Sequence, residues 1–313
     1  MTSRRTENKI VLVVRRTRMD EMIARFNTED QARFYIEHLG ADFSDYQTED
    51  RVYKQAAREA EDVLSRHGRV QVIERTFVPN FIFGPRDTVV AIGQDGLVAN
   101  VLKYLDGQPL IGVNPDTQRW EGVLLPFTVK DLDRLMPEIF AQKRPLADVT
   151  IAEAKLNNGE SLAAVNDLFI GPRSHTSARY TLRIGERTEY HSSSGIIVST
   201  GLGSTGWLRS IMAGATGVAS ALSGRALPFD ERGTVAWDAD YLHFSVREPW
   251  PSKTSGAQII FGKVTREQPL VIASQMPENG VIFSDGIESD FLRFNSGAVA
   301  TISVAQRKGR LVT

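Results

Sequence analysis

The chain contains no cysteine, and this absence excludes several kinds of site at once. Disulfides, thiolate metal sites and a cysteine nucleophile all require the missing thiol. The five histidines are scattered, and none stands in a spacing typical of a zinc hydrolase. The sequence therefore predicts neither a disulfide-stabilised fold nor a zinc enzyme.

The chain also lacks an excess of either charge and any long hydrophobic run. Lys plus Arg number 37 and Asp plus Glu number 38, so the formal net charge is -1. Such a balance produces no global field that would attract nucleic acid or an anionic membrane. The apolar run 10–14 ends at Arg15-Arg16 and is far too short for a signal peptide or a membrane span. We expect a cytoplasmic protein that binds neither nucleic acid nor membranes.

The hydrophobic pattern changes near residue 146, and this change predicts two domains. Before it, four strands are expected at 9–14, 70–73, 88–92 and 109–113, and they alternate with helical patterns. Strands that alternate with helices predict an α/β domain with a largely parallel sheet. After it, short runs of period two predict an all-β, β-sandwich-like domain, interrupted by one helix that begins about Ser204.

The stretch Gly201-Leu202-Gly203-Ser204-Thr205-Gly206 matches the G-x-G-x-x-G fingerprint of dinucleotide-binding oxidoreductases. That fingerprint belongs after the first strand of a βαβ unit, with an acidic residue about 20 positions beyond it. Here the match lies in the β-rich half. Asp230 stands at the right distance, but its surroundings do not read as a buried strand. We therefore expect this turn to serve different chemistry.

A second glycine motif, Gly93-Gln94-Asp95-Gly96, joins the expected strand 88–92 to a helical pattern. Unpaired backbone N–H groups and the helix dipole at such a junction attract phosphate. A carboxylate in that position would be repelled by phosphate unless a metal ion or a substrate hydroxyl lay between them. The alternative is that Asp95 only caps the helix.

Three segments together carry a resemblance to a known family. They are Gly93-Gln94-Asp95-Gly96-Leu97, Val165-Asn166-Asp167-Leu168 and Gly203-Ser204-Thr205-Gly206-Trp207. In this order they resemble the G-G-D-G-T loop, the Asn-Asp or Asn-Glu pair and the G-S-T-A-Y-like turn of the NAD kinase family. The segments between them are most similar to its mitochondrial-type branch and the bacterial relatives of that branch. The resemblance covers nearly the whole chain.

This resemblance implies a domain plan, a reaction and an assembly. Residues 1–146 would form the α/β nucleotide-binding domain, 147–297 the β-rich NAD-binding domain, and 298–313 a segment returning to the first domain. The reaction would be Mg²⁺-dependent phosphoryl transfer from ATP to the 2′-hydroxyl of the adenosine ribose of NAD, giving NADP. The protein would form a homodimer or a higher homo-oligomer.

The resemblance also implies site residues. Asp95 would be the catalytic base or would face the metal, and no other protein ligand for a metal is expected. The donor phosphates would lie on Gly93, Gln94, Gly96 and Leu97. The NAD site would include Asn166, Asp167, Thr205, Gly206, Trp207 and Ser210. From the residues alone, Asn166-Asp167 could be a simple turn, Ser204 and Thr205 could be helix caps, and Trp207 could belong to the core.

Two residues depart from the family loop, because Gln94 replaces its second glycine and Leu97 replaces its threonine. If these changes disturb the donor site, the protein binds NAD without catalysis. A kinase of the same superfamily that acts on a lipid or sugar alcohol is a further alternative. The sequence leaves open whether the donor is ATP, another nucleotide or polyphosphate, and whether NAD or NADH is preferred.

Overall fold

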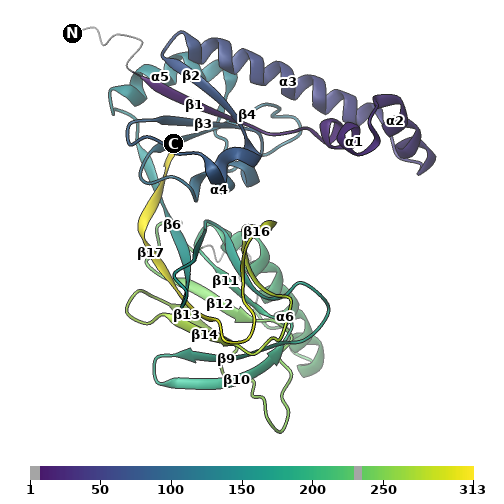
Figure 1. Cartoon of the computed structure of the whole chain (residues 1–313), viewed down its shortest axis with the longest axis vertical. Helices are drawn as coiled ribbons and strands as arrows, with labels where there is room; N and C mark the ends of the chain where they lie inside the picture. Colours follow the sequence, from purple (N-terminus) through teal and green to yellow (C-terminus); the bar gives the residue numbers. More distant parts are fainter. Residues whose placement is uncertain (1–7, 229–234) are drawn as a thin grey trace. The chain divides into compact units, whose positions relative to one another are not determined.

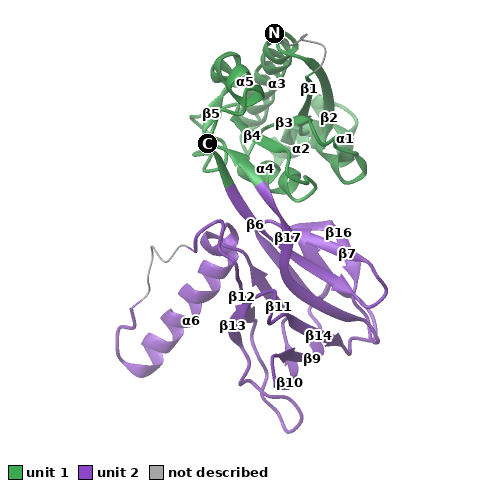
Figure 2. Cartoon of the chain, turned by 90° about the vertical axis from the view of Figure 1, so that its left-hand side faces the viewer, with its two compact units in different colours: residues 1–147, 310–313 green, residues 148–309 purple. Residues whose placement is uncertain are grey.

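The structure is a computed structural model that describes residues 8–228 and 235–313. The chain divides into two compact units (Figure 2). Unit 1 contains residues 1–147 and 310–313, and unit 2 contains residues 148–309. Asp230, which stands at the fingerprint distance from the glycine turn, lies outside the described residues.

Unit 1 is built on a parallel sheet. Its strands, in the spatial order β4-β3-β1-β2, are β4 (Pro109–Asn114), β3 (Thr88–Ile92), β1 (Lys9–Val14) and β2 (Arg69–Glu74). All three pairings are parallel. The short strand β5 (Phe127–Thr128) pairs with the end of β4. The runs of Val, Ile and Leu in β1 and β3 are buried, as expected for strands covered on both faces.

Helices cover both faces of this sheet (Figure 1). The long helix α3 (Ser44–Ser65) and α5 (Leu132–Phe140) share one hydrophobic core with β1, β3 and β4. Helix α4 (Asp95–Leu102) packs on β3 and β4 from the opposite face. Two further helices, α1 (Arg18–Phe26) and α2 (Glu29–His38), follow β1 and form a small cluster of their own.

Unit 2 contains two stacked sheets. The strands of the first are β6 (Leu146–Leu156), β7 (Ser161–Ala164), β9 (Ala178–Ile184), β10 (Arg187–Ser193), β14 (Leu270–Ser274) and β17 (Val299–Val312). The strands of the second, in spatial order, are β13 (Phe261–Val264), β12 (Leu242–Val246), β11 (Ile196–Ser199), β8 (Asp167–Pro172), β15 (Gly280–Ser284) and β16 (Ile287–Arg293). Side chains of both sheets, such as Leu182 and Phe244, share one core. The predicted α/β domain followed by a β-sandwich-like domain is therefore confirmed.

Strand β17 runs from one unit into the other. Residues 299–302 pair with β14 in unit 2, and the pairs Arg310–Pro109 and Leu311–Leu110 add the end of β17 to β4 in unit 1. The last residues of the chain thus complete the parallel sheet of the first unit.

The sheet order of unit 1 creates a switch point between β1 and β3. From β1 the chain crosses to β2 on one side, and it then returns to β3 on the other side. Loops that leave the carboxyl ends of neighbouring strands in opposite directions open a crevice, where α/β proteins bind ligands. Arg15 follows β1 and Gly93 follows β3, so both residues lie at this point.

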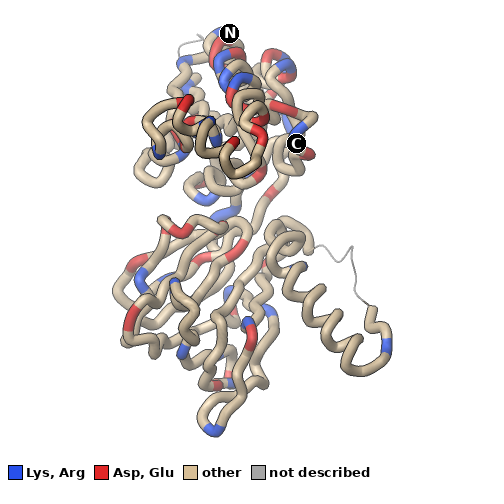
Figure 3. Tube along the Cα trace, turned by 90° about the vertical axis from the view of Figure 1, so that its right-hand side faces the viewer, with Lys and Arg blue, Asp and Glu red and all other residues tan. Residues whose placement is uncertain are grey.

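Helix α6 (Trp207–Ser223) follows β11 and has few buried and few charged side chains. Leu208 is its one buried residue, and Arg209 is its one charged residue. Figure 3 shows that most of this helix is free of charged residues. Val218 and Leu222 are 62% and 84% exposed. Within residues 8–228 and 235–313, no helix combines the length and apolar character needed to cross a membrane.

Candidate functional site

The predicted site residues fall into two groups, one in each unit. Gly93, Gln94, Asp95, Gly96 and Leu97 lie in unit 1 at the start of α4. The predicted NAD-binding residues lie in unit 2, where Asn166 immediately precedes β8, Asp167 begins it, and the glycine turn follows β11. Each group has its own local chemistry.

The loop after β3 forms a tight junction between strand and helix. Gln94 is the N-cap residue of α4, with an extended backbone and no side-chain hydrogen bond to the helix. A Cβ atom on Gly93 would lie 2.9 Å from the Leu97 side chain and 3.6 Å from Nε of Arg15. A side chain at position 93 would therefore force the Leu97 side chain to shift, whereas Gly96 faces open space.

Asp95 is the first residue of α4, and its carboxylate is held from outside the helix. The backbone N–H of Leu124 donates to Oδ1 of Asp95 at 2.7 Å. In the described part of the chain, no group pairs with the other carboxylate oxygen. The interpretation of Asp95 as a helix cap is wrong, because Gln94 occupies the cap position. The carboxylate is oriented at one oxygen and available at the other.

Leu97 has a packing role that explains its departure from the family loop. Its side chain is 1% exposed and lies directly against Gly93. A threonine here would leave part of this space empty and bury a hydroxyl group. Leu97 therefore contributes to the core beneath the loop rather than presenting a polar group.

Tyr53 ties together the two strands of the switch point, and the sequence analysis did not identify it. Its hydroxyl accepts a hydrogen bond from the backbone N–H of Arg15 at 2.8 Å and donates to the carbonyl of Ile92 at 3.1 Å. Burial raises the pKa of Tyr53 to about 12, so the hydroxyl stays protonated at neutral pH. The carboxyl ends of β1 and β3 are thus held at a fixed separation just before Gly93.

Arg15 places a buried positive charge beside the Gly93 loop. Its Nη2 donates to Glu49 at 2.8 Å, while its buried Nε has no partner among the described residues. Burial of Glu49 opposes ionisation, but hydrogen bonds from Arg18 and Arg15 outweigh it and lower the pKa of Glu49. Glu49 therefore remains the counterion of both arginines.

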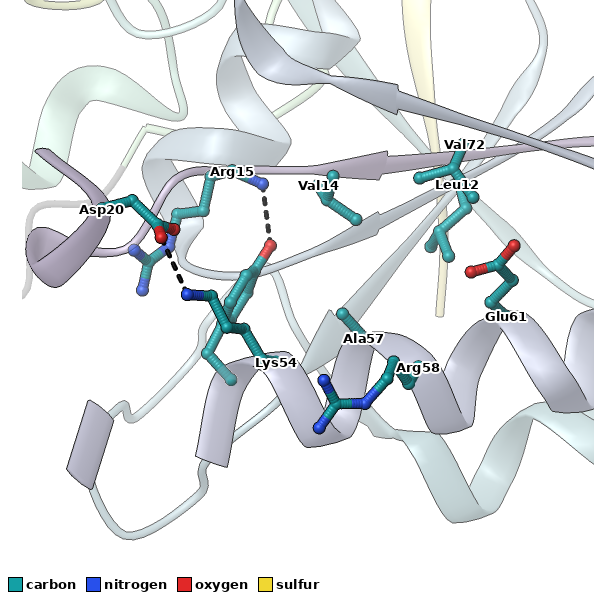
Figure 4. Close-up of a pocket in the computed structure, with 10 residues that line it drawn as sticks. Leu12, Val14, Arg15, Asp20, Lys54, Ala57, Arg58, Glu61 and Val72 are labelled. Carbon is teal, nitrogen blue, oxygen red and sulfur yellow. Dashed lines mark hydrogen bonds and ion pairs between the residues drawn. The ribbon is translucent and has the colours of Figure 1, made fainter. Parts of the chain in front are cut away.

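A pocket of about 250 Å³ opens beside Arg15, between β1 and α3 (Figure 4). Its floor includes Leu12 and Val72, and an ion pair of 2.8 Å joins Lys54 to Asp20 at its rim. Arg15 and Tyr53 belong both to the lining of this pocket and to the surroundings of the switch point.

In unit 2, the carboxylate of Asp285 organises the turn that precedes β8. It accepts hydrogen bonds from three consecutive backbone N–H groups, those of Val165 (3.1 Å), Asn166 (2.7 Å) and Asp167 (3.3 Å). Asp285 itself lies in the left-handed region, with φ 54°, in the hairpin turn with Gly286. The Asp-Gly pair is the usual signal for such a turn, but it does not reveal what the carboxylate binds.

Asp285→Ala is expected to lower the free energy of unfolding by about 2–4 kcal/mol, because three backbone N–H groups lose their acceptor and alanine disfavours positive φ. Asp285→Asn is the matched control, since asparagine tolerates this conformation and keeps one acceptor oxygen. The free energy of unfolding of Asp285→Asn should fall by about half as much as that of Asp285→Ala. Urea unfolding measures both, and equal stability of the two variants would contradict the role given to the carboxylate.

Asp167 carries the most strongly perturbed carboxyl group of the second site. The pKa of Asp167 is raised to about 7, mainly by burial; a hydrogen bond from Ser199 opposes this increase, and the nearby charge of Asp285 adds to it. Its buried Oδ1 has no hydrogen-bond partner within the described residues. An unpaired buried acceptor is costly in the absence of a ligand, so this oxygen is suited to accept a bond from a bound hydroxyl or amino group.

The glycines of the third motif allow two close backbone approaches. A Cβ on Gly201 would collide with the carbonyl oxygen of Ala236, and one on Gly203 with the carbonyl oxygen of Asn166. The strand before this turn, β11, is antiparallel to both of its neighbours. A Rossmann site is therefore excluded here, and the turn instead brings its backbone against Asn166.

The remaining predicted residues surround the start of α6. Thr205, Gly206 and Ser210 are exposed. Trp207 is half-buried, and its ring stacks on Phe169 at a centroid distance of 5.9 Å and an interplanar angle of 5°. This contact favours the interpretation of Trp207 as a packing residue.

Helix α6 begins without a side-chain cap. Its N-cap residue is Gly206. The hydroxyl of Ser204 instead donates to the carbonyl of Gly201 at 2.7 Å. The capping role considered for Ser204 and Thr205 is therefore wrong.

Two solved structures share the fold of this chain. An NAD kinase from Archaeoglobus fulgidus in complex with ATP has a TM-score of 0.55 and 15% sequence identity, over 97% of this chain and 93% of that chain. Yeast NADH kinase complexed with NADH has a TM-score of 0.56 and 14% identity, over 98% of this chain and 83% of that chain.

Sequence comparison adds no relative to these structures. No family model matches the chain, and no curated protein matches it significantly. The expected resemblance to NAD kinases is thus confirmed for the two-domain fold.

Proposed function

We propose that this protein is an NAD kinase, which transfers a phosphoryl group from ATP to the 2′-hydroxyl of the adenosine ribose of NAD. One observation carries the proposal. In a chain with the fold of NAD kinases, Asp95 stands at the start of α4 with one carboxylate oxygen fixed by Leu124 and the other available. A fixed acceptor beside a phosphate-binding turn is what proton removal from an attacking hydroxyl requires.

The donor phosphates are assigned to the loop after β3. The first N–H groups of α4 and the positive end of its dipole favour an anion here. Gly93 keeps the backbone accessible, and the Arg15 guanidinium adds positive charge nearby. In this proposal Asp95 accepts the hydroxyl proton while the loop holds the group that is transferred.

Magnesium fits the donor set without a dedicated protein cage. No group of three or more His, Asp or Glu side chains able to hold a metal occurs in residues 8–228 and 235–313. Mg²⁺ commonly takes one or two carboxylates and otherwise binds water and substrate phosphates. Asp95 is the residue that would hold it, and the ion would neutralise phosphate charge during transfer.

The NAD side is assigned to Asn166, Asp167 and the glycine turn. The Asn166 amide both donates and accepts, and an ionised Asp167 only accepts. A ribose hydroxyl or the adenine amino group would supply the donor that Oδ1 of Asp167 lacks. Thr205, Gly206 and Ser210 are exposed near this turn and complete the proposed surface.

A cytoplasmic location and a homodimer belong to the same proposal. The exposed apolar residues of α6, Val218 and Leu222, suit self-association. Analytical ultracentrifugation of the purified chain measures the assembly directly.

Replacing Gln94 and Leu97 one at a time by the residues of the family loop is expected to change different properties, the first the KM for ATP and the second the stability. Gln94→Gly should lower the apparent KM for ATP, because it removes a side chain at the helix start, at a stability cost of about 1 kcal/mol or less. Leu97→Thr should lower the free energy of unfolding by about 2–4 kcal/mol. ATP saturation curves at fixed Mg²⁺ and urea unfolding test both. An unchanged KM would mean that Gln94 belongs to a working form of the loop.

The proposal is tested by following the terminal phosphate of labelled ATP into a panel of acceptors. NAD, NADH, a diacylglycerol and a sugar alcohol are offered separately to the purified protein with Mg²⁺. We expect label in NAD, NADH or both. Label in the lipid or the sugar alcohol would identify the alternative kinase reaction. No transfer, together with an NAD-dependent rise in thermal stability, would identify a non-catalytic NAD-binding protein.

A further inference from the structure

Unit 1 contains a second, larger pocket at the edge of the sheet where the parallel strands begin. Its volume is about 560 Å³, and Thr88 of β3 and Pro109 of β4 contribute to its walls. Gly93 follows the opposite end of β3, whose 5 residues span about 16 Å at roughly 3.3 Å per residue. The pocket is therefore separate from the Gly93 loop, and the proposed reaction uses none of its residues.

Three arginines line this pocket, namely Arg86, Arg144 and Arg310. The one acidic residue among its described lining residues is Asp87, which is buried and paired with Lys9 at 2.9 Å. Asp87 is therefore already neutralised. The charge that faces the cavity is positive.

Two of the arginines are unpaired. Arg86 and Arg310 are exposed, and neither side chain has a hydrogen bond or an ion pair within residues 8–228 and 235–313. Arg144 is held in place, because its Nε donates to the backbone oxygen of Thr313 at 2.9 Å and its Nη1 to Glu138 at 3.3 Å. One fixed and two available guanidinium groups thus converge from three segments of the chain.

The rest of the wall is apolar and comes partly from the end of α5. Ile139 and Phe140 lie there, and Leu146 and Pro109 continue this surface. Guanidinium groups bind phosphate oxygens in a planar, paired geometry, while an apolar wall accommodates a ring. The volume also lies within the range of small-molecule sites.

We propose that this pocket binds a nucleoside phosphate, with the phosphate on Arg86 and Arg310 and the ring against the apolar wall at the end of α5. Arg144 borders the same cavity and supplies a further positive charge. The site is distinct from the proposed ATP and NAD sites and does not depend on the proposed reaction.

The absence of cysteine allows a local test. Pro85→Cys, on the exposed rim, is labelled with an environment-sensitive fluorophore and titrated with AMP, adenosine and inorganic phosphate. AMP should give a saturable signal, whereas the affinities for adenosine and for phosphate should each be lower by about tenfold or more. A second label at the exposed Lys143→Cys repeats the titration in case the first dye blocks the pocket.

The same titration in R86Q/R310Q should show AMP affinity lower by about tenfold or more. The control is R51Q/R66Q, which removes the same charge from exposed arginines of unit 1 that do not line the pocket. The proposal is overturned if neither label responds to AMP, or if both double variants lose affinity equally. Equal affinity for AMP and phosphate would overturn the ring contact.

Discussion

Asp95→Asn is expected to lower the turnover of NADP formation by a factor of roughly 100 or more while leaving the fold intact. Asparagine keeps an oxygen that can accept the hydrogen bond from the Leu124 N–H, which Asp95 accepts at 2.7 Å. It replaces the available carboxylate oxygen with an amide that cannot take a proton. The loss should therefore fall on kcat rather than on stability.

The matched control is Asp106→Asn, which removes the same charge from an exposed position in unit 1. It should retain parental turnover. Initial rates with saturating ATP and NAD, together with thermal unfolding of each variant, make the comparison. Parental turnover in Asp95→Asn would reduce Asp95 to an anchor for the loop that contains Leu124.

NAD should bind about tenfold more tightly at pH 8 than at pH 6. Burial raises the pKa of Asp167 to about 7, so the fraction of this carboxylate that is ionised rises about tenfold over the interval. If the ionised form accepts a hydrogen bond from NAD, affinity follows that fraction. Calorimetry at both pH values measures the change.

Asp167→Asn should remove this pH dependence, which separates it from contributions of other groups. Asp285 interacts with Asp167, and His243 on β12 is cross-strand to Ser199, the hydrogen-bond partner of Asp167. Both remain in the variant. A tenfold pH dependence that persists in Asp167→Asn would assign the titration to another group and contradict the proposed contact.

The stability of the unliganded protein should change in the opposite direction. The folded state binds the proton of Asp167 up to about pH 7, whereas the unfolded chain releases it near pH 4. Folding is therefore favoured below this window, and stability falls as pH rises through it. The loss from this group amounts to at most about 4 kcal/mol, and Asp167→Asn should abolish it.

Local sequence predicted the strands of unit 1 well because their signal is local. The runs at 9–14 and 88–92 are rich in β-branched and apolar residues, and they form β1 and β3. Helices α1 and α2 were not predicted, because each buries few residues and their sequences are rich in charge. They pack on one another through a small apolar cluster that includes Met19 and Ile36, and they are capped at Thr17 and Thr28.

The supporting residues of the site could not be predicted, because their partners are distant in sequence. The Asp285 carboxylate accepts bonds from backbone groups that lie about 120 residues earlier in the sequence. Tyr53 bonds to the backbone of Arg15, 38 residues before it, and of Ile92, 39 residues after it. Gly201 and Gly203 stood out as a motif, but their reason lies in close approaches to Ala236 and Asn166. Motifs identified candidate residues, while the tertiary fold determines what each one contacts.

The central claim is tested most directly by incubating the purified protein with Mg²⁺, ATP and NAD and measuring NADP with a dehydrogenase that is specific for it. We predict that NADP accumulates in proportion to the protein and that omission of ATP or NAD abolishes its formation. Binding of NAD without any NADP under these conditions would contradict the proposed kinase activity.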